Sequence, residues 1–380
     1  MIKVGLENID EYRHLFDKKR LGIITNPTGV NHQFKSTVDL LVEKFHVTAL
    51  FSPEHGIRGN LQAGVHLDPY HDDKTNTMVY SLYGHTRKPT PEMLHQVDVL
   101  VFDIQDVGAR FYTFLYTMVY AMQSCQELSK TFVVLDRPNP LGGIKVEGNL
   151  LDLTYRSFVG YYAIPQRFGL TIGELALYVN DVEKIGCDLH VIPMKGWRRG
   201  MHYQDTGLHW VLPSPNIPTP ETCYPYIATC LFEGTNVSEG RGTTKPFHFI
   251  GAPWMKAEDV IKQFSMLNLK GITLRQQYFT PMFSKHQGQL CNGVECVVTD
   301  DQQAELVFAG MALYKIIETI HPEFEVLPPF REGSHPFIQL LVGDQFLQHD
   351  TIGLEAIRQK LKHDEDKFQR IKEHYHLYEV

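Results

Sequence analysis

Short apolar runs alternate with longer amphipathic stretches over the first half of the chain. The short runs predict buried strands, and the longer stretches, in which apolar residues recur every three or four positions, predict helices. Such alternation is typical of a mostly parallel sheet wound with helices, so the expected class is α/β with a Rossmann-like outline. The expected strands are residues 21–25, 47–51, 99–104, 132–135 and 190–193. The expected helices are residues 36–45, 111–128 and 171–185.

A proline-rich segment, residues 213–220, interrupts this pattern. Proline fixes φ and removes a backbone donor, so the segment can continue neither a helix nor a central strand. We therefore expect a Rossmann-like domain of residues 1–225 and a smaller α+β domain of residues 226–380. The pattern beyond the boundary predicts a helix from Ala257, strands at 272–279 and 294–299, a helix near 302–320 and a charged helix from about Thr351.

The charge distribution narrows the range of partners. The chain has 36 basic and 44 acidic residues, interleaved without a basic stripe, so no nucleic-acid partner is expected. No apolar run approaches the roughly 18 residues of a membrane span, and no membrane insertion is expected. The first residues lack the pattern of a signal peptide, which predicts a cytoplasmic protein, or a secreted one if an export signal was removed. The oligomeric state is left open.

Motifs for cofactors are missing from the sequence. Residues 25–30 read TNPTGV where a dinucleotide site would need G-x-G-x-x-G, and there is no Walker A motif. The histidines show neither H-E-x-x-H nor the spacing of a zinc site. The six cysteines form no C-x-x-C pair, which favours buried, reduced thiols over a disulfide or metal framework. We expect no nucleotide, metal or other cofactor.

A carboxylate and an imidazole, Glu54 and His55, come just after the apolar run of residues 47–51. Pro53 restrains the turn, and Gly56 gives the backbone freedom. In open α/β sheets ligands bind at the carboxyl ends of the strands. Glu54 is therefore the first candidate for chemistry.

Two acids and an arginine follow the strand expected at residues 99–104. A buried acid must be paired or hydrogen-bonded, so Asp103 and Asp106, with Arg110, either line a site or cap the next helix. Tyr112, at the start of that helix, is placed to reach the same edge.

Residues 136–149 follow a third strand and form a proline- and glycine-rich loop that contains Asn139 and Glu147. Such a loop either turns the chain or brings its backbone close to a ligand. Its position on the same sheet edge as Glu54 favours the second interpretation.

A second polar loop lies in the smaller domain. Residues 233–244 are rich in glycine and contain Glu233, Glu239 and Arg241. Glycines that allow φ > 0, together with charged side chains, can fold over a polar ligand. The alternative is a surface linker with solvated charges.

Several long motifs carry a resemblance to a known family. They read FSPEHGIRG, SLYG, DIQDVGARFYT, LDRPNPLGG, TIGELA, PSPNIPT and EGTNVSEGRGTTKPF, followed by IGAPW. In this order they resemble the DUF1343 family, whose characterised members are NamZ-type exo-β-N-acetylmuramidases of peptidoglycan recycling. The resemblance implies a Rossmann-like catalytic domain, a smaller C-terminal domain and a cleft between them.

The activity that the resemblance implies is removal of N-acetylmuramic acid from the non-reducing end of a peptidoglycan fragment. Glycoside hydrolysis needs an acid for the leaving oxygen and a second group at the anomeric carbon. The family motif makes Glu54 the acid/base. The candidates for its partner, in order of preference, are Glu239, Asp103, Asp106, Glu147 and Glu233. The acetamido group of the substrate could replace a protein nucleophile.

The lactyl carboxylate of N-acetylmuramic acid calls for a cation, and arginine can bind a carboxylate in a bidentate manner. Arg241 and Arg110 are the first candidates and Arg58 the next, whereas for Arg137 the alternative is to brace its loop. The remaining substrate-binding candidates are His55, Tyr112, Asn139, Glu147 and Glu233.

Three other functions stay open at this point. The nearest is a β-N-acetylglucosaminidase that acts on the related sugar. The second is a non-catalytic protein that binds peptidoglycan fragments in the same cleft. The third is a nucleotide-dependent Rossmann-like enzyme, which the missing glycine motif disfavours.

Overall fold

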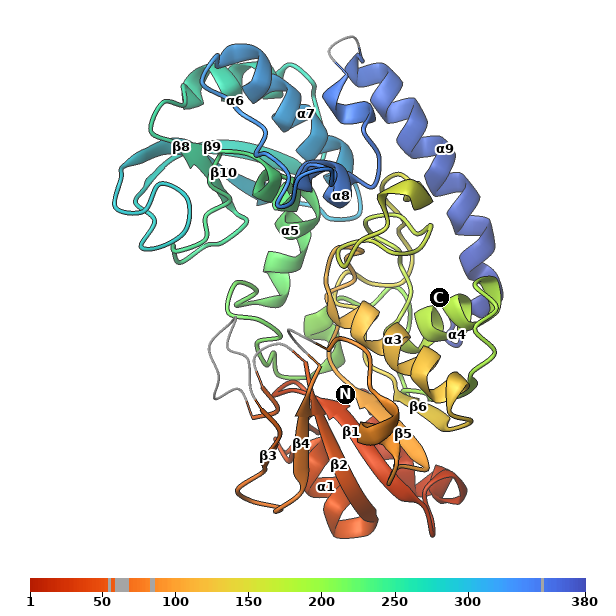
Figure 1. The fold of residues 1–380 in the computed structure, drawn as a ribbon. Helices are drawn as coiled ribbons and strands as arrows, with labels where there is room; N and C mark the ends of the chain where they lie inside the picture. Colours follow the sequence, from red (N-terminus) through yellow and green to blue (C-terminus); the bar gives the residue numbers. More distant parts are fainter. Residues whose placement is uncertain (54–55, 59–67, 83–85, 350–351) are drawn as a thin grey trace.

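The computed structural model describes residues 1–53, 56–58, 68–82, 86–349 and 352–380. Within these residues a large domain is built on a seven-stranded sheet and a small domain on a three-stranded sheet (Figure 1). The α/β class expected from the sequence is confirmed.

The large sheet has the order β3-β4-β2-β1-β5-β6-β7, and all neighbours are parallel except β3 and β4. The strands are β1 (Arg20–Thr25), β2 (His46–Ser52), β3 (Tyr70–His71), β4 (Met78–Ser81), β5 (Val99–Asp103), β6 (Thr131–Leu135) and β7 (Asp188–Ile192). The five predicted strands are confirmed with ends shifted by at most two residues. The sequence did not predict β3 and β4, because they are too short to show a pattern.

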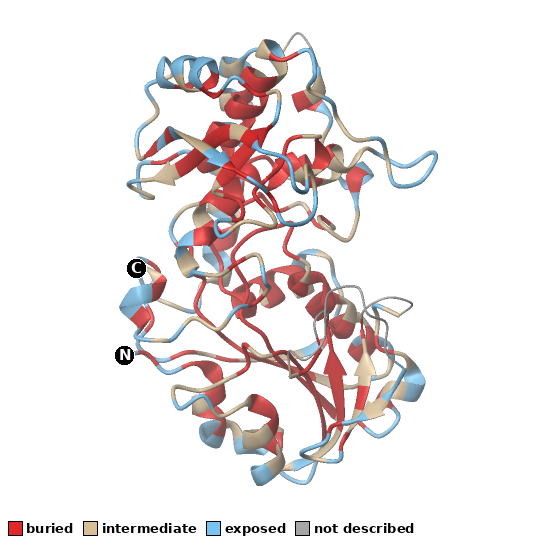
Figure 2. Ribbon diagram, turned by 90° about the vertical axis from the view of Figure 1, so that its left-hand side faces the viewer, coloured by how far each residue is buried: buried red, intermediate tan, exposed pale blue. Residues whose placement is uncertain are grey.

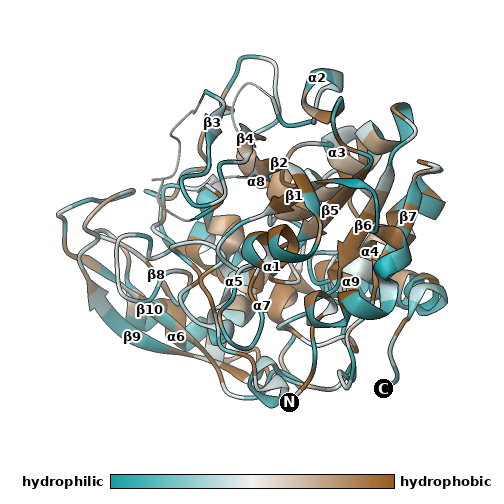
Figure 3. Cartoon of the chain, turned by 90° about the horizontal axis from the view of Figure 1, so that it is seen from below, coloured by the Kyte–Doolittle hydropathy of each residue, from teal (hydrophilic) through white to brown (hydrophobic). Residues whose placement is uncertain are grey.

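Helices cover both faces of this sheet, and the pleat decides which residues meet which helix. The helices are η1 (Gly5–Leu15), α1 (Thr37–Lys44), α2 (Pro91–Leu94), α3 (Phe114–Glu127), η2 (Leu153–Tyr155), α4 (Ile172–Val182) and η3 (Tyr203–Thr206). In β5, Leu100 and Phe102 share a core with α3 and α4, whereas Val99 and Val101 pack with α1 and η1. Figure 3 shows these apolar strands and the more hydrophilic β9 of the small domain.

A capping box begins α4, as the sequence predicted. Thr171 Oγ1 accepts from the Glu174 backbone N–H at 3.2 Å, and Glu174 Oε2 accepts from the Thr171 N–H at 3.0 Å. Two of the free N–H groups at the start of the helix are thereby satisfied.

The strand order reverses between β1 and β5. The chain runs from β1 outwards through β2 to β4, and then returns to the other side of β1 with β5. Loops that leave adjacent strands in opposite directions open a crevice at the carboxyl edge, where open α/β proteins bind ligands. In Figure 1 this edge points towards the small domain.

The small domain holds an antiparallel sheet of order β8-β10-β9. Its strands are β8 (Phe249–Ala252), β9 (Ile272–Phe279) and β10 (Cys291–Val298). The remaining helices are η4 (Pro220–Thr222), α5 (Cys223–Thr229), η5 (Cys230–Gly234), α6 (Ala257–Ser265), α7 (Leu306–Ile320), α8 (Phe337–Val342), η6 (Phe346–Gln348), α9 (Leu354–Lys372) and η7 (Glu373–Tyr375). The chain enters this domain through α5, so the boundary expected after residue 225 falls inside a helix.

The C-terminal segment returns to the large domain, which the sequence pattern did not predict. Helix α9 runs along both domains (Figure 1). The ammonium of Lys372 at its end is buried, and it donates to the carbonyls of Gly143 and Gly169 at 2.7 and 3.1 Å. Burial lowers the pKa of Lys372 to about 7. Beyond the helix, the Tyr378 hydroxyl donates to Asp136 Oδ2 at 2.5 Å.

Buried residues gather in the strands of both sheets and in the helices packed on them (Figure 2). All six cysteines lie among the described residues, and each is buried with a free thiol, as expected. None of the helices in the described part of the chain has the length and apolar character needed to cross a bilayer.

Candidate active site

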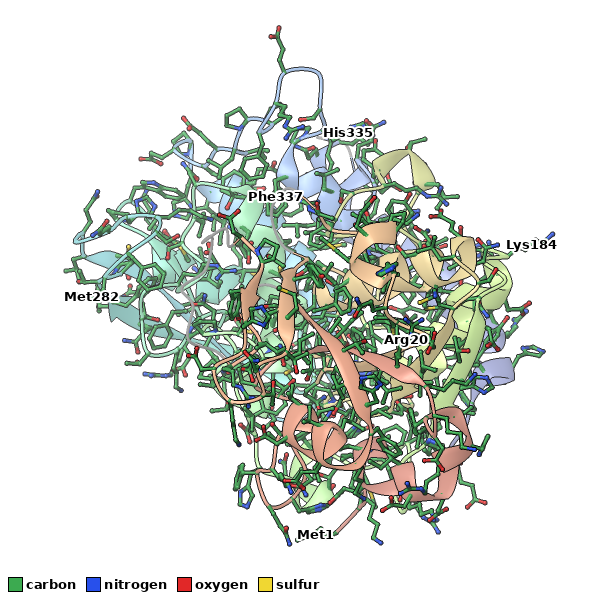
Figure 4. All side chains as sticks on the ribbon, turned by 60° about the horizontal axis from the view of Figure 1, so that its bottom comes forward. Met1, Arg20, Lys184, Met282, His335 and Phe337 are labelled. Atoms are coloured by element: carbon green, nitrogen blue, oxygen red, sulfur yellow. The ribbon has the colours of Figure 1, made fainter. Side chains whose placement is uncertain are left out.

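A cavity of about 220 Å³ lies where the two domains meet. From the large domain, residues 111–114 after β5 and residues 214–216 line it. From the small domain, α5, η5, the loop after η5 and α8 close it. Figure 4 shows Phe337 of α8 near the middle of the molecule, whereas Met282 lies at the outer edge of the small domain.

Charged side chains from the loop after η5 form a compact cluster at this cavity. Arg241 Nη2 donates to Glu233 Oε1 at 2.7 Å, and Arg241 Nε lies 3.3 Å from Glu239 Oε1. Lys285 Nζ lies 2.7 Å from the other oxygen of Glu239. Two carboxylates and two cations therefore balance, with Glu233 and Arg241 lining the cavity and Glu239, only 2% exposed, behind them.

The electrostatics of the cluster favour a proton on Glu233. Burial raises the pKa of Glu233, and Glu239 adds to this rise, whereas Arg241 opposes it. Burial alone would lower the pKa of Arg241, but Glu233 and Glu239 outweigh it and raise that pKa. Arg241 stays charged, and the pKa of Glu233 is raised although Arg241 lies beside it.

Glycine allows the loop to place this cluster. Gly240 has φ +78°, and a Cβ there would lie 2.8 Å from the carbonyl oxygen of Phe249. The neighbouring Ser238 exchanges backbone hydrogen bonds with Gly251 at the end of β8. The turn thus fixes the loop against the small sheet and directs Glu233 and Arg241 towards the cavity.

Aromatic rings form the opposite wall. Phe111 meets Tyr226 of α5 edge to face at a centroid distance of 4.9 Å, and Tyr112 meets Tyr226 at 6.2 Å. Tyr112 lines the cavity, as the sequence suggested. A cavity that combines aromatic walls with polar and charged side chains can bind a polar small molecule.

Asp103 is engaged elsewhere. It is fully buried at the end of β5, where it accepts from Arg137 Nη2 at 2.9 Å and from the hydroxyl of Thr37. Arg137 also donates to the Val30 carbonyl at 3.0 Å. In this structure the pair braces the loops after β1 and β6, and neither residue lines the cavity between the domains.

Asp106 is 6% exposed. Its Oδ2 accepts from the Gly108 N–H at 2.6 Å, and its Oδ1 is buried without a hydrogen-bond partner in the described part of the chain. Burial raises its pKa to about 7. Asp106 does not belong to the described lining of the cavity.

The placement of Arg110 argues against a role in binding the lactyl carboxylate. The side chain is fully buried, and burial lowers its pKa to about 10. Its guanidinium donates to the carbonyls of Asn149 and Ile164 at 2.8 Å, and to those of Leu341 and Val342 at 3.0 and 2.6 Å. Arg110 thus joins the two domains: both terminal nitrogens of its guanidinium donate to backbone carbonyls, whereas its buried Nε has no hydrogen-bond partner in the described part of the chain.

Asn139 and Glu147 also have structural partners. Asn139 donates to the Leu170 carbonyl at 2.8 Å and accepts from the Leu141 N–H at 2.9 Å, which holds the loop after β6. Glu147 pairs with Arg167 at 2.6 Å and lines a separate groove beside α9. The structure does not bring either residue to the cavity.

Three other candidates follow β2 in the sequence. Glu54 and His55 fall outside the described residues, so their roles remain predictions. Arg58 donates to both carboxylate oxygens of Asp72 at 2.8 Å and lies 3.3 Å from Asp39. These carboxylates raise the pKa of Arg58.

Other residues of the cavity region were not predicted from the sequence. Lys285, Tyr226 and Phe337 come from segments far apart in the chain, and no local motif marks them. Asn216, which also lines the cavity, lies within the PSPNIPT motif. In the described part of the chain, no group of three or more His, Cys, Asp or Glu side chains is arranged to hold a metal ion.

Comparison with known proteins places the chain in a family. Residues 21–221 match the N-terminal domain, and residues 224–378 the C-terminal domain, of exo-β-N-acetylmuramidase NamZ. The chain is 53% identical over 330 residues to peptidoglycan β-N-acetylmuramidase NamZ of Bacillus subtilis (strain 168), which covers 86% of this chain and 80% of that protein.

Two crystal structures of DUF1343 family proteins from Bacteroides fragilis share the fold. They superpose with TM-scores of 0.89 and 0.80 at 38% and 33% identity, and each comparison covers 100% of this chain and 99% of the other. The resemblance seen in the sequence motifs is confirmed, and the chain belongs to the NamZ exo-β-N-acetylmuramidase family.

Proposed function

We propose that this protein is an exo-acting β-N-acetylmuramidase that releases N-acetylmuramic acid from the non-reducing end of peptidoglycan fragments. The observation that carries the proposal is the interdomain cavity with the Glu233–Arg241 pair in its wall. Family membership supplies the reaction class, and the cavity supplies a place for one terminal sugar.

The dimensions of the cavity favour exo action. Pockets for drug-sized ligands span about 300–1,000 Å³, and the cavity of about 220 Å³ is smaller than that range. It suits a single sugar unit better than an internal stretch of glycan. The aromatic wall can contact the apolar face of the sugar ring, while the charged loop meets its polar substituents.

Arg241 is the cation that we assign to the lactyl carboxylate. Among the described residues that line the cavity it is the single positive charge, and its guanidinium can donate to a carboxylate. A third carboxylate brought next to Glu233 and Glu239 would further favour protonation of Glu233.

Glu54 remains the proposed general acid. In that role it transfers a proton to the glycosidic oxygen as the bond to the anomeric carbon breaks, and water supplies the hydroxyl of the released sugar. Glu233, which lines the cavity, is the described carboxylate that we assign to the second role, at the anomeric carbon. Glu239, which lies behind Arg241, acts as a positioning residue for the guanidinium.

The test is release of the free sugar from a disaccharide of N-acetylmuramic acid β-linked to N-acetylglucosamine, followed by chromatography. Glu54→Gln should abolish turnover while calorimetry still detects binding of the disaccharide. Glu43→Gln serves as the control, because Glu43 is an exposed residue of α1 that pairs with Lys35. Release of sugar only from an N-acetylglucosamine glycoside would overturn the specificity, and binding without cleavage by the unaltered protein would overturn the activity.

A further inference from the structure

A second, smaller pocket lies at the carboxyl edge of the large sheet and is lined by residues of the loops after β1, β5 and β6. Its volume is about 20 Å³, and its lining includes Gln105, His32 and Arg137. The exposed aromatic side chain of Phe34 and the ring of His209 also belong to it. None of these five residues lines the cavity between the domains.

Phe34 is held in an unusual position for a large apolar residue. Its side chain is 57% exposed, and its backbone adopts φ +59°, which bulky residues rarely do. The turn is fixed because the Asn31 side chain accepts from the N–H groups of residues 33 and 35 at 3.0 and 2.9 Å. The ring stacks on His209 at 5.1 Å with an interplanar angle of 29°. The result is an aromatic surface open to solvent.

Polar atoms in the pocket lack partners. Gln105 is 3% exposed, and its amide N–H groups donate to the carbonyls of Asp106 and Pro138 at 2.8 and 2.7 Å. Its Oε1 is buried and has no hydrogen-bond partner in the described part of the chain, and the same holds for His32 Nε2. The other ring nitrogen of His32 lies 2.5 Å from Glu7. Buried polar atoms are nearly always satisfied, so both point to a polar ligand or water.

The two sites are close to each other along the chain. Val211 lines the small pocket and Ser214 lines the interdomain cavity. Three residues span at most about 11 Å when fully extended. Neighbouring sugar units of one saccharide can bridge such a separation.

We propose that the exposed aromatic surface of Phe34 and His209, beside this pocket, binds the sugar that carries the leaving oxygen, while the pocket itself has room for a single polar group. Phe34 and His209 stack against the ring of that sugar, and Gln105 with His32 bind its hydroxyl or acetamido groups. This proposal rests on the proposed function, because it assigns the leaving-group side of the same reaction. An aromatic platform suits a sugar, since one face of a pyranose carries mainly C–H groups while its edge carries hydroxyls.

The test compares two substrates with leaving groups of different size. One is the disaccharide of N-acetylmuramic acid β-linked to N-acetylglucosamine, and the other is methyl β-N-acetylmuramide, whose leaving group is too small to reach Phe34. Phe34→Ala should lower kcat/KM for the disaccharide about tenfold, as loss of one stacking contact predicts. The kcat/KM for the methyl glycoside should be the same as in the unaltered protein. Tyr278→Ala removes an equally exposed aromatic ring from β9 and should change neither substrate.

Each outcome bears on a different claim. Equal losses on both substrates, or no loss on the disaccharide, would overturn the leaving-group site and leave the proposed activity intact. If the unaltered protein cleaves neither substrate, the proposed function fails, and calorimetry then decides the site. In that case weaker binding of the disaccharide by Phe34→Ala would support it, and unchanged binding would overturn it.

Discussion

Replacing Asp106 with Asn tests whether its buried carboxyl holds a proton at neutral pH. Burial raises the pKa of Asp106 from 3.8 to about 7. Three units of difference from the unfolded chain correspond to at most about 4 kcal/mol. Between pH 4 and 7 the folded protein binds this proton and the unfolded chain does not, so the free energy of unfolding falls as pH rises through that window. Asp106→Asn lacks this dependence, because an amide does not titrate.

Urea unfolding of both proteins at pH 5 and pH 8, followed by tryptophan fluorescence, measures the effect. Relative to the wild type, Asp106→Asn should gain about 2.6 kcal/mol between the two pH values, because the part of the window below pH 5 lies outside the measured range. Other buried acids with raised pKa values, such as Asp136 and Glu365, are common to both proteins and cancel in the difference. The Gly108 N–H can still donate to the amide oxygen, so the turn after β5 should persist.

If the free energies of unfolding of the two proteins differ by the same amount at pH 5 and at pH 8, the reasoning is refuted. That outcome would mean that Asp106 is ionised throughout, with water or another group at its Oδ1.

The same variant also tests whether Asp106 has a structural or a catalytic role. Because Asp106 does not belong to the described lining of the cavity, we expect Asp106→Asn to retain activity, and complete loss of turnover would restore it as a catalytic candidate.

Three further changes test other parts of the structure. In the wild type, KM should rise as pH increases through the raised pKa of Glu233, because ionised Glu233 competes with the substrate carboxylate for Arg241. Glu233→Gln should flatten the dependence of KM on pH between pH 5 and 8. An unchanged slope would exclude Glu233 as the cause of that dependence. Arg110→Met should lower the free energy of unfolding, measured in urea, by at least about 3 kcal/mol, because it leaves buried carbonyls in both domains without a donor. A loss below about 1 kcal/mol would contradict the role of Arg110 in joining the domains. Thr171→Ala should lower the free energy of unfolding by about 2 kcal/mol, near the upper end for an N-cap, because Thr171 also donates to Asp136. Thr154→Ala, on the exposed turn η2, is the control and should show no such loss in the same assay.

The large sheet could be predicted because its information is local. The central strands β1, β5 and β6 are apolar on both faces, as strands between two helical layers must be, so each one shows as a continuous apolar run in the sequence. Strands β3 and β4 span two and four residues, which is too short for a pattern to emerge. The return of the C-terminal segment to Asp136 and Glu174 depends on contacts across about 200 residues of sequence, which no local signal reveals.

The candidate site shows the same division. Glu233, Glu239 and Arg241 lie within nine residues, so one loop brings them together, and the sequence identified that loop as a unit. Arg110 was interpreted as a ligand for an anion because it is a charge beside a strand end. Its partners are backbone carbonyls, which have no signature in the sequence, and two of them lie more than 230 residues away.

The link between the domains is also part of the cavity wall. Arg110 donates to the carbonyl of Leu341, and Leu341 itself lines the cavity together with Phe337 one turn earlier in α8. Because the guanidinium is fully buried and bound on both sides, the two domains have little freedom to separate at this point. The cavity is therefore largely preformed, with α8 fixed above residues 111–114. Substitutions at Arg110 should then weaken substrate binding as well as folding, although the side chain touches no substrate.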